Sequence, residues 1–130
     1  MPLQFNIITP NKIFLKDQAN EILLSTNTGK MGVLIGHAPL VTALDVGVFL
    51  YRSTNTWTSI ALMGGFALVL QDNITILVNE AESADTIYLQ EALECLEFAR
   101  QQFFQAKNSK ERVSANFILK RAQARLKVVS

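Results

Sequence analysis

The chain has 130 residues, of which 49% are hydrophobic and 18% charged, and its formal net charge is +1. This composition predicts one ordinary domain, or two small modules that share a core, and it excludes a disordered tail. A single cysteine, Cys95, and a single histidine, His37, exclude an intramolecular disulfide framework and a four-ligand zinc site, so we expect no metal. No apolar run reaches the ~18 residues that span a bilayer, and the opening residues show no pattern of a cleaved leader, so we expect none.

The near-zero net charge conceals an uneven distribution. Residues 1–86 carry four Lys/Arg against seven Asp/Glu, whereas residues 87–130 carry eight Lys/Arg against four Glu. Glycine stops at Gly65 and proline at Pro39. An acidic part rich in turn formers is therefore followed by a basic part without helix breakers, and this change predicts two modules of different structure.

From residue 3 to about residue 80, apolar residues alternate with a period of two, as in half-buried strands. The alternating sets are Leu3, Phe5 and Ile7; Ile13 and Leu15; Ile22 and Leu24; Val48 and Leu50; Phe66, Leu68 and Leu70; and Ile74, Ile76 and Val78. Turn-forming residues separate these short runs, and no helix-length pattern lies between them. The spacing favours an antiparallel sandwich or barrel, with each alternating set facing a core.

From about Thr86 the apolar residues recur at steps of three and four, which predicts a helix with Asp85 as its candidate N-cap. A polar segment, residues 107–110, separates it from a second helix for which Ser109 is a candidate cap. The two predicted apolar stripes are Leu89, Leu93, Leu96, Ala99 or Arg100, and Phe103, and then Ala115, Ile118, Leu119, Ala122 and Leu126. Two helices with a short link predict an antiparallel hairpin, and we expect domains at residues 1–85 and 86–130.

Two motifs in the first part could carry chemistry. His37 lies in a loop where nothing marks a nucleophile, so we favour a histidine that orders a turn or touches a partner, and a small hydrolase is the weakest hypothesis. Gly64-Gly65 is followed by neither a Lys-Ser/Thr pair nor a helix, which favours a tight turn or bulge over a phosphate loop.

The carboxylates Glu80, Glu82 and Asp85 cluster before the first predicted helix. A general acid/base pair is one interpretation. We favour a solvated strand exit beside a helix N-terminus, which accommodates negative charge.

Residues 105–130 carry the strongest charge signal, with seven Lys/Arg against Glu111 alone. Arg121 and Arg125 are four residues apart and share one helix face. The helix macrodipole accounts for part of this excess, and the remainder predicts an acidic partner, either a protein or a nucleic acid. Nucleic acid is less favoured, because the first part is acidic and the phenylalanines of the tail lie in or beside apolar stripes. A basic adaptor that binds nucleic acid through the hairpin is the alternative function.

Six segments, in order, carry a resemblance to a known family: Ile8-Thr9-Pro10-Asn11, residues 22–29, residues 32–40, residues 61–67, residues 77–82 and residues 115–125. Over essentially its whole length the chain resembles the epsilon subunit of the proton-translocating rotary ATP synthase, of the chloroplast and cyanobacterial type. The resemblance implies an α+β fold, with an N-terminal antiparallel β-sandwich of about ten strands and a C-terminal two-helix hairpin. It also implies a non-catalytic rotor subunit of the central stalk, without a cofactor, that couples the c-ring to gamma and restrains ATP hydrolysis through its hairpin. The complex places such a subunit at the thylakoid membrane, peripheral on the stromal side, or on the cytoplasmic side in cyanobacteria.

The resemblance also implies roles for individual residues. Gly36, His37, Ala38 and Pro39 match the segment close to gamma, and Lys30 and Met31 match the segment that faces the c-ring. Three further residues, Lys120, Arg121 and Arg125, match basic positions of the second helix that meet an acidic segment of the catalytic beta subunits.

One departure from the family concerns nucleotide binding. Some bacterial members bind ATP through a segment Ile/Leu-Asp-x-x-Arg-Ala at the start of the first helix. Here Tyr88 stands at the Asp position and Glu91 at the Arg position. Because Glu91 would repel a phosphate that an arginine would bind, we expect no useful ATP affinity.

Overall fold

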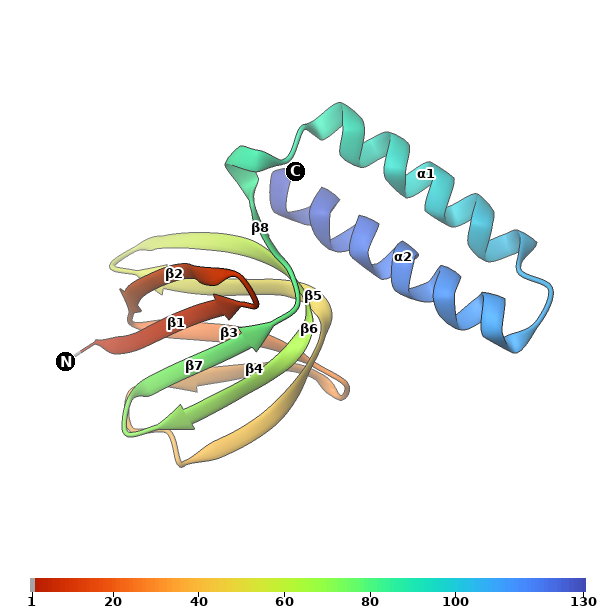
Figure 1. Ribbon diagram of the computed structural model, residues 1–130. Helices are drawn as coiled ribbons and strands as arrows, with labels where there is room; N and C mark the ends of the chain where they lie inside the picture. Colours follow the sequence, from red (N-terminus) through yellow and green to blue (C-terminus); the bar gives the residue numbers. More distant parts are fainter. Residues whose placement is uncertain (1) are drawn as a thin grey trace.

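The computed structural model describes residues 2–130, which form an eight-stranded sheet followed by two helices (Figure 1). The strands are β1 (Leu3–Thr9), β2 (Lys12–Ala19), β3 (Glu21–Thr26), β4 (Gly29–Leu34), β5 (Leu40–Ser53), β6 (Thr56–Leu70), β7 (Asn73–Val78) and β8 (Ala81–Ser83). A 3-10 turn, η1 (Ala84–Thr86), leads to the helices α1 (Leu89–Gln105) and α2 (Ser109–Val129). The predicted fold class is confirmed, with eight strands where about ten were expected.

The strand order is β2-β1-β7-β6-β5-β3-β4, and β8 pairs with β6. All pairs are antiparallel except β1 with β7, which run parallel. The long strands β5 and β6 cross both layers of the sandwich, since β6 pairs with β8 through its first half and with β7 through its second half. This arrangement explains why fewer, longer strands replace the expected short ones.

Gly64 and Gly65 lie where β6 changes partners. Both have positive φ values, +76° and +149°, which L side chains rarely adopt. A Cβ atom on Gly65 would lie 2.0 Å from the backbone oxygen of Leu77, so only glycine lets β6 and β7 approach at this point. Strand β6 continues through both glycines without a turn or a register shift, so the predicted tight turn or bulge is wrong, although the backbones do approach closely at Gly65.

The sandwich core consists of side chains from both layers, and an aromatic group lies at its centre. Phe5, Phe49 and Tyr51 pack with ring centroids 4.8 to 5.9 Å apart, within the range of favourable aromatic pairs. The fully buried side chains around them include Leu3, Ile7, Ile22, Leu24, Ile74 and Ile76, as the alternation predicts.

The prediction is wrong for one alternating set and for one member of another, since Leu15 packs partly against the core as predicted but Ile13 does not. Phe66, Leu68 and Leu70 point away from the core, and the intervening Ala67 and Val69 fill it. Ile13 is likewise exposed. Because this part of β6 is apolar on both faces, its pattern does not determine which face is buried.

Both predicted helix caps are also corrected. Asp85 belongs to η1, where its carboxylate accepts a hydrogen bond from the Ser83 hydroxyl, and α1 begins four residues later without a side-chain cap. The cap of α2 is Asn108, whose Oδ1 accepts from the Glu111 amide at 2.9 Å, so Ser109 is the first helical residue. Glu111 returns a bond by accepting from the Lys107 amide at 2.7 Å. The Asn108 carboxamide and the Glu111 carboxylate thus each accept a hydrogen bond from a backbone amide that has no partner within the helix.

The hairpin is joined mainly through small side chains. The buried residues between the helices include Ala92 and Ala99 of α1 and Ala115 and Ala122 of α2, each pair spaced seven residues apart. Larger side chains of the predicted stripes are half-exposed or exposed, for example Leu89, Leu93 and Ile118.

The hairpin touches the sandwich through the C-terminal half of α2, and the rest of it projects beyond the sheet (Figure 1). A second, smaller apolar cluster forms this contact. It contains Val48, Ala61 and Met63 from the strands and Ile87, Ala92, Ala124 and Val128 from the hairpin. Within residues 2–130, neither helix has the length and apolar character that crossing a membrane requires.

Candidate functional site

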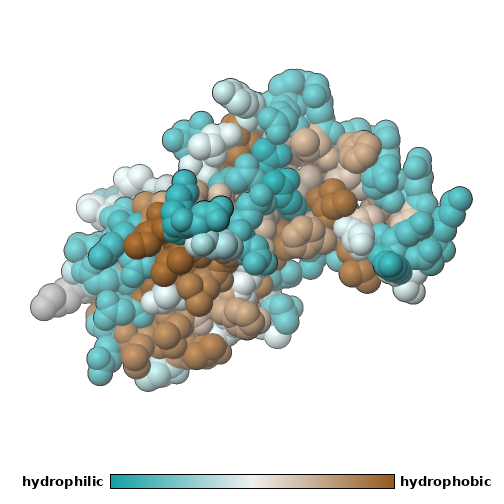
Figure 2. Space-filling model, in the orientation of Figure 1, coloured by the Kyte–Doolittle hydropathy of each residue, from teal (hydrophilic) through white to brown (hydrophobic). Residues whose placement is uncertain are grey.

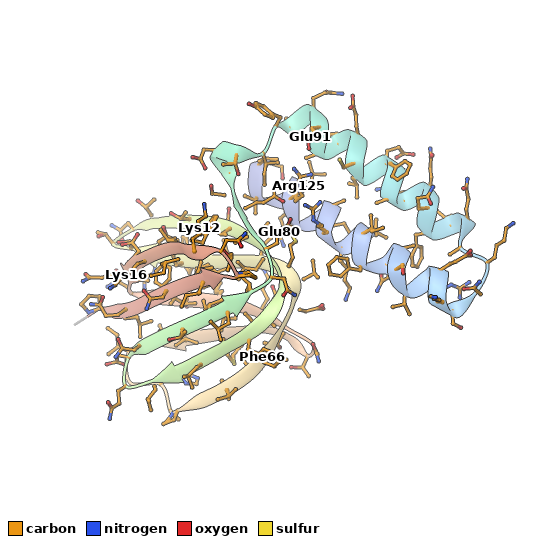
Figure 3. All side chains as sticks on the ribbon, in the orientation of Figure 1. Lys12, Lys16, Phe66, Glu80, Glu91 and Arg125 are labelled. Carbon is orange, nitrogen blue, oxygen red and sulfur yellow. The ribbon has the colours of Figure 1, made fainter. Side chains whose placement is uncertain are left out.

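The basic side chains of α2 lie against carboxylates of the strands and of α1. Arg125 is the centre of this arrangement, since its side chain is only 7% exposed. Its Nε lies 2.9 Å from Oε1 of Glu82 on β8, an ion pair without the alignment of a hydrogen bond. Its Nη2 donates to Oε1 of Glu91 on α1 at 3.2 Å. Arg125 therefore joins three elements, and Figure 3 shows it between β8 and Glu91.

Two neighbouring cations make further pairs. Arg121 donates from Nε to Oε1 of Glu80 at 2.8 Å and reaches Oε1 of Glu82 at 3.5 Å. Nζ of Lys120 lies 3.0 Å from Oδ2 of Asp45 on β5. We refer to the three cations and their carboxylates as the ion-pair cluster, which consists of Lys120, Arg121, Arg125, Asp45, Glu80, Glu82 and Glu91.

Protonation in the ion-pair cluster follows from these contacts. The hydrogen bond from Arg121 lowers the pKa of Glu80 below its ordinary value, against the opposing effect of partial burial. The same hydrogen bond raises the pKa of Arg121. Burial alone would lower the pKa of Arg125, but the charges of Glu82 and Glu91 raise it. The contacts therefore favour the charged forms of Glu80, Arg121 and Arg125.

The favoured interpretation, a solvated strand exit, agrees with Glu80, whose side chain is 46% exposed, and is wrong for Glu82, whose side chain is 19% exposed. Strand β8 turns back along β6, with Ala61 opposite Glu82 and Leu62 opposite Ala81, and this carries both carboxylates beneath α2. Three of the seven cations of residues 105–130, namely Lys120, Arg121 and Arg125, consequently have acidic partners within the same chain. The pairing joins residues as far as 75 positions apart, so no local pattern in the sequence could have indicated it.

The loop of Gly36, His37, Ala38 and Pro39 lies at the far end of β4. Gly36 has a φ of +84°, and its amide donates to Oδ1 of Asp72 in the turn between β6 and β7 at 2.7 Å. The His37 amide donates to the Leu34 carbonyl at 3.1 Å, and His37 Nδ1 lies 2.7 Å from the Ala38 carbonyl oxygen. These bonds fix the turn, and the loop around His37 is largely exposed.

An apolar surface covers the outside of the sheet beside this loop. Strand register aligns Phe66 with Leu77, Leu77 with Ile8, and Ile8 with Ile13, which makes a row across four strands. Val41 and Leu68 form a second pair on the same side. We call these six residues the outer apolar face; Ile8 is half-buried, and the exposed fractions of the other five run from 43% to 69%.

All six side chains of the outer apolar face are apolar, and Figure 2 shows brown, apolar surface gathered over this part of the sandwich. Exposed apolar patches of this kind mark interaction sites in soluble proteins. The alternation in the sequence identified Phe66 and Leu68 as members of one strand face. It placed that face in the core, whereas the structure places it on the surface.

The remaining predicted positions lie apart from this face. Lys30 is exposed on β4 and lines a surface depression of about 320 Å³ together with Lys120 and Lys127. Met31 packs partly against the sandwich core. Tyr88 is 75% exposed, and the Glu91 carboxylate forms an ion pair with Arg125. Within residues 2–130, no group of three His, Cys, Asp or Glu side chains is placed to hold a metal ion.

The fold is thus a β-sandwich with a two-helix hairpin packed on it partly through ion pairs. The family described as "ATP synthase, Delta/Epsilon chain, beta-sandwich domain" matches residues 2–84. Chloroplastic ATP synthase epsilon chains of Chlorella vulgaris and Oltmannsiellopsis viridis are each 57% identical over 129 residues, with 99% of this chain covered and 96% and 98% of theirs. That of Chlamydomonas reinhardtii is 50% identical over 135 residues, with 99% of this chain and 96% of its own covered.

The chain thus belongs to the family of ATP synthase epsilon chains. The prediction that the chain resembles an epsilon subunit of the ATP synthase is confirmed.

Two solved structures share the fold. A chain of the Euglena gracilis mitochondrial ATP synthase, solved with OSCP, F1 and c-ring, is similar with a TM-score of 0.83 and 24% identity, covering 97% of this chain and 79% of its own. A chain from the central stalk and c-ring of the Tetrahymena thermophila enzyme gives a TM-score of 0.64 and 14% identity, covering 98% and 96%.

Proposed function

We propose that this chain couples the c-ring to gamma in the rotor of a chloroplast ATP synthase and restrains ATP hydrolysis through its hairpin. It acts at the thylakoid membrane, on the stromal side, and associates with the membrane through the complex alone. Membership of the epsilon family and the chloroplastic relatives support this proposal. The outer apolar face is the observation that carries the assembly step, because a rotor subunit without chemistry of its own needs a stable contact with its neighbour.

Gamma binds, in this proposal, at the outer apolar face and at the adjoining loop of Gly36, His37, Ala38 and Pro39. The bond from Gly36 to Asp72 holds that loop against the end of β6 and β7, so loop and face present one continuous surface. A sheet face with exposed Phe66, Leu68 and Leu77 gains free energy when a partner removes it from water. Lys30 and Met31 face the polar loops of the c-ring in this proposal. The support for this placement is that the two residues match the family segment that faces the c-ring.

The hairpin contacts the catalytic beta subunits through Lys120, Arg121 and Arg125, which meet an acidic segment there. Seven Lys/Arg in residues 105–130 support an electrostatic contact of this kind. The ion-pair cluster engages these three cations within the chain, so the contact with beta requires that the hairpin leaves the sandwich.

The assembly step is tested by Phe66→Glu in the full chain. Phe66 is 59% exposed, so the variant folds, and a charge at the centre of the face lowers the affinity for isolated gamma more than about tenfold. Trp57→Glu is the control, because Trp57 is an exposed aromatic residue on the other half of β6. Equal binding of gamma by Phe66→Glu and the unchanged chain, measured by surface plasmon resonance, would place gamma elsewhere.

A further inference from the structure

We propose that the surface depression between β4 and α2 is a binding site for a phosphate group. Three lysines line it, Lys30 from β4 and Lys120 and Lys127 from α2, and we call it the lysine depression. Its volume of about 320 Å³ lies at the lower end of the range for small-molecule sites, which suits a compact anion. No residue of the outer apolar face lines the depression, so the site is separate from the proposed contact with gamma.

The local structure brings these cations together. Lys120, Gln123 and Lys127 follow one another at steps of three and four residues, so they share one face of α2. Lys30 reaches the same depression from the β3–β4 hairpin, where it pairs with Ser25 in the strand register. A helix of one module and a strand of the other therefore supply cations to a single recess.

Small groups of the sheet and the helix form the floor of the lysine depression. Val48 and Ala124 are buried there, whereas Lys30 and Lys127 are exposed at the rim. The Ser25 hydroxyl donates to the Val48 carbonyl at 3.2 Å, so it is not available as a donor to a ligand. The donors that remain for a ligand are the three ammonium groups and the Gln123 carboxamide.

The charge of the depression matches that of a phosphate group. Within residues 2–130, neither Lys30 nor Lys127 forms an ion pair, and no carboxylate lines the depression. Nζ of Lys120 lies 3.0 Å from Oδ2 of Asp45, which is the one anion paired with these cations. Three ammonium groups against one carboxylate leave two positive charges. A phosphate monoester carries about −1.5 to −2 charges at neutral pH.

Asp45 also holds one of the cations in place. An ammonium group has three donors, and Asp45 accepts from one of them, so Lys120 keeps two for an anion in the depression. A cation that is held in advance loses less conformational entropy when the ligand binds. Lys30 and Lys127 are exposed and must be ordered on binding. We therefore expect a weak site, with a Kd of about 1 mM for inorganic phosphate.

A phosphate group uses these donors better than a carboxylate does. Its oxygens point in several directions and can accept from ammonium groups on opposite sides of the recess, and lysine binds phosphate as a point charge. Among the described residues that line the depression, none is aromatic, so it offers no stacking surface for a nucleobase. Millimolar binding of phosphate here is therefore compatible with the absence of micromolar affinity for ATP.

The test follows the amide resonances of the isotope-labelled full chain during a titration with inorganic phosphate at constant ionic strength. We expect the amides of Lys30, Gly47 and Gln123, which line the depression, to shift along saturable curves with a Kd of about 1 mM. Chloride in place of phosphate produces no saturable curve. Lys30→Gln and Lys127→Gln each raise the Kd at least about threefold, and the double variant raises it at least about tenfold.

Lys110→Gln is the matched control, because Lys110 is an exposed cation of the same helix outside the depression. It removes the same charge, and we expect it to leave the Kd unchanged. All three lysines are exposed, so the variants fold, and equal melting temperatures verify this. Linear shifts without saturation, or equal effects of Lys30→Gln and Lys110→Gln, would show a general response to charge and would overturn the site.

A second arm distinguishes free phosphate from the phosphate of a lipid headgroup. The full chain is sedimented with vesicles of phosphatidylglycerol and with vesicles of phosphatidylcholine. If a headgroup occupies the depression, the chain sediments with the anionic vesicles alone, and the double variant Lys30→Gln/Lys127→Gln does not. If free phosphate occupies it, the titration saturates and the two chains sediment equally. The proposal is wrong if phosphate does not saturate and vesicle binding does not depend on the two lysines.

Discussion

Nε of Arg125 lies 2.9 Å from Oε1 of Glu82, and this contact links the last helix to the shortest strand of the sandwich. The chain therefore joins an acidic module and a basic module through complementary charges. Because the Arg125 side chain is only 7% exposed, salt screens this pair weakly, whereas the half-exposed Lys120 and Arg121 pairs respond more to ionic strength. The proposed contact of the basic hairpin with an acidic partner is an exposed one, so inhibition of ATP hydrolysis by the purified subunit is predicted to decline as the ionic strength rises. Inhibition that does not change with salt concentration would contradict an electrostatic contact.

The isolated chain is predicted to have no micromolar affinity for ATP. Tyr88 offers no carboxylate at the start of α1, and Glu91 already neutralises the guanidinium group of Arg125. Isothermal titration calorimetry of the full chain with ATP should give no heat above that of dilution. A saturable isotherm with a micromolar Kd would contradict this account of the ion-pair cluster.

A chain cut after Asp85 is predicted to fold and to bind gamma. The sandwich core of Phe5, Phe49 and their neighbours lies wholly within residues 3–78, and the outer apolar face is unaffected by the cut. Exposure of Val48 and Met63 costs about 2–4 kcal/mol of unfolding free energy, at about 25 cal/mol per Å² of apolar area. Urea unfolding measures the loss, and a fragment that is unfolded without denaturant would show that the sandwich is not an independent domain.

Gly65→Ala is predicted to destabilise the sandwich by more than about 3 kcal/mol, because large losses follow when a strained backbone must shift. The added Cβ would lie 2.0 Å from the Leu77 oxygen, and the φ of +149° is unfavourable for alanine. Gly32→Ala is the control, since its Cβ would meet only Leu23 Cδ2 at an ordinary 3.5 Å. Similar melting temperatures for the two variants would refute the role assigned to Gly65.

Docking of the hairpin is predicted to be constant between about pH 6 and pH 8 and to weaken below about pH 4. The pKa of Glu80 is lowered from 4.5 by its hydrogen bond from Arg121, so the folded state favours the ionised carboxylate. Its contribution is complete above the unfolded pKa and is lost as the pH falls through the lowered value. The methyl resonance of Met63, which the hairpin covers, should therefore shift only in the acidic range; a shift between pH 6 and pH 8 would identify a different titrating group.

Much of the fold could be predicted because local patterns in the sequence determine where the strands and helices form. The alternation of Leu3, Phe5 and Ile7 and the change of period after residue 86 depend on near neighbours in the chain. The buried face of β6 could not be predicted, since Phe66, Leu68 and Val69 are all apolar and only the partners of β6 determine which of them face the core.

The charged site was predictable only in part. The tail's excess of Lys and Arg led to the prediction of an external acidic partner, which stays a prediction, while the pairs within the chain depend on how β8 folds back along β6. The prediction of Asp85 as the N-cap of α1 was wrong for a similar reason. Asp85 lies in η1, where its carboxylate accepts from the Ser83 hydroxyl before α1 begins. Pairings of this kind depend on the tertiary arrangement, so they produce no regular spacing of residues by which the sequence could reveal them.

The central claim is that this subunit, a rotor component without chemistry of its own, restrains hydrolysis through its basic hairpin. The most direct measurement is the ATP hydrolysis rate of the purified complex before removal of this subunit, after removal, and after the subunit is returned. The account predicts that hydrolysis rises on removal and falls again with the full chain, but not with the chain cut after Asp85. A rate that is unchanged by removal would contradict it.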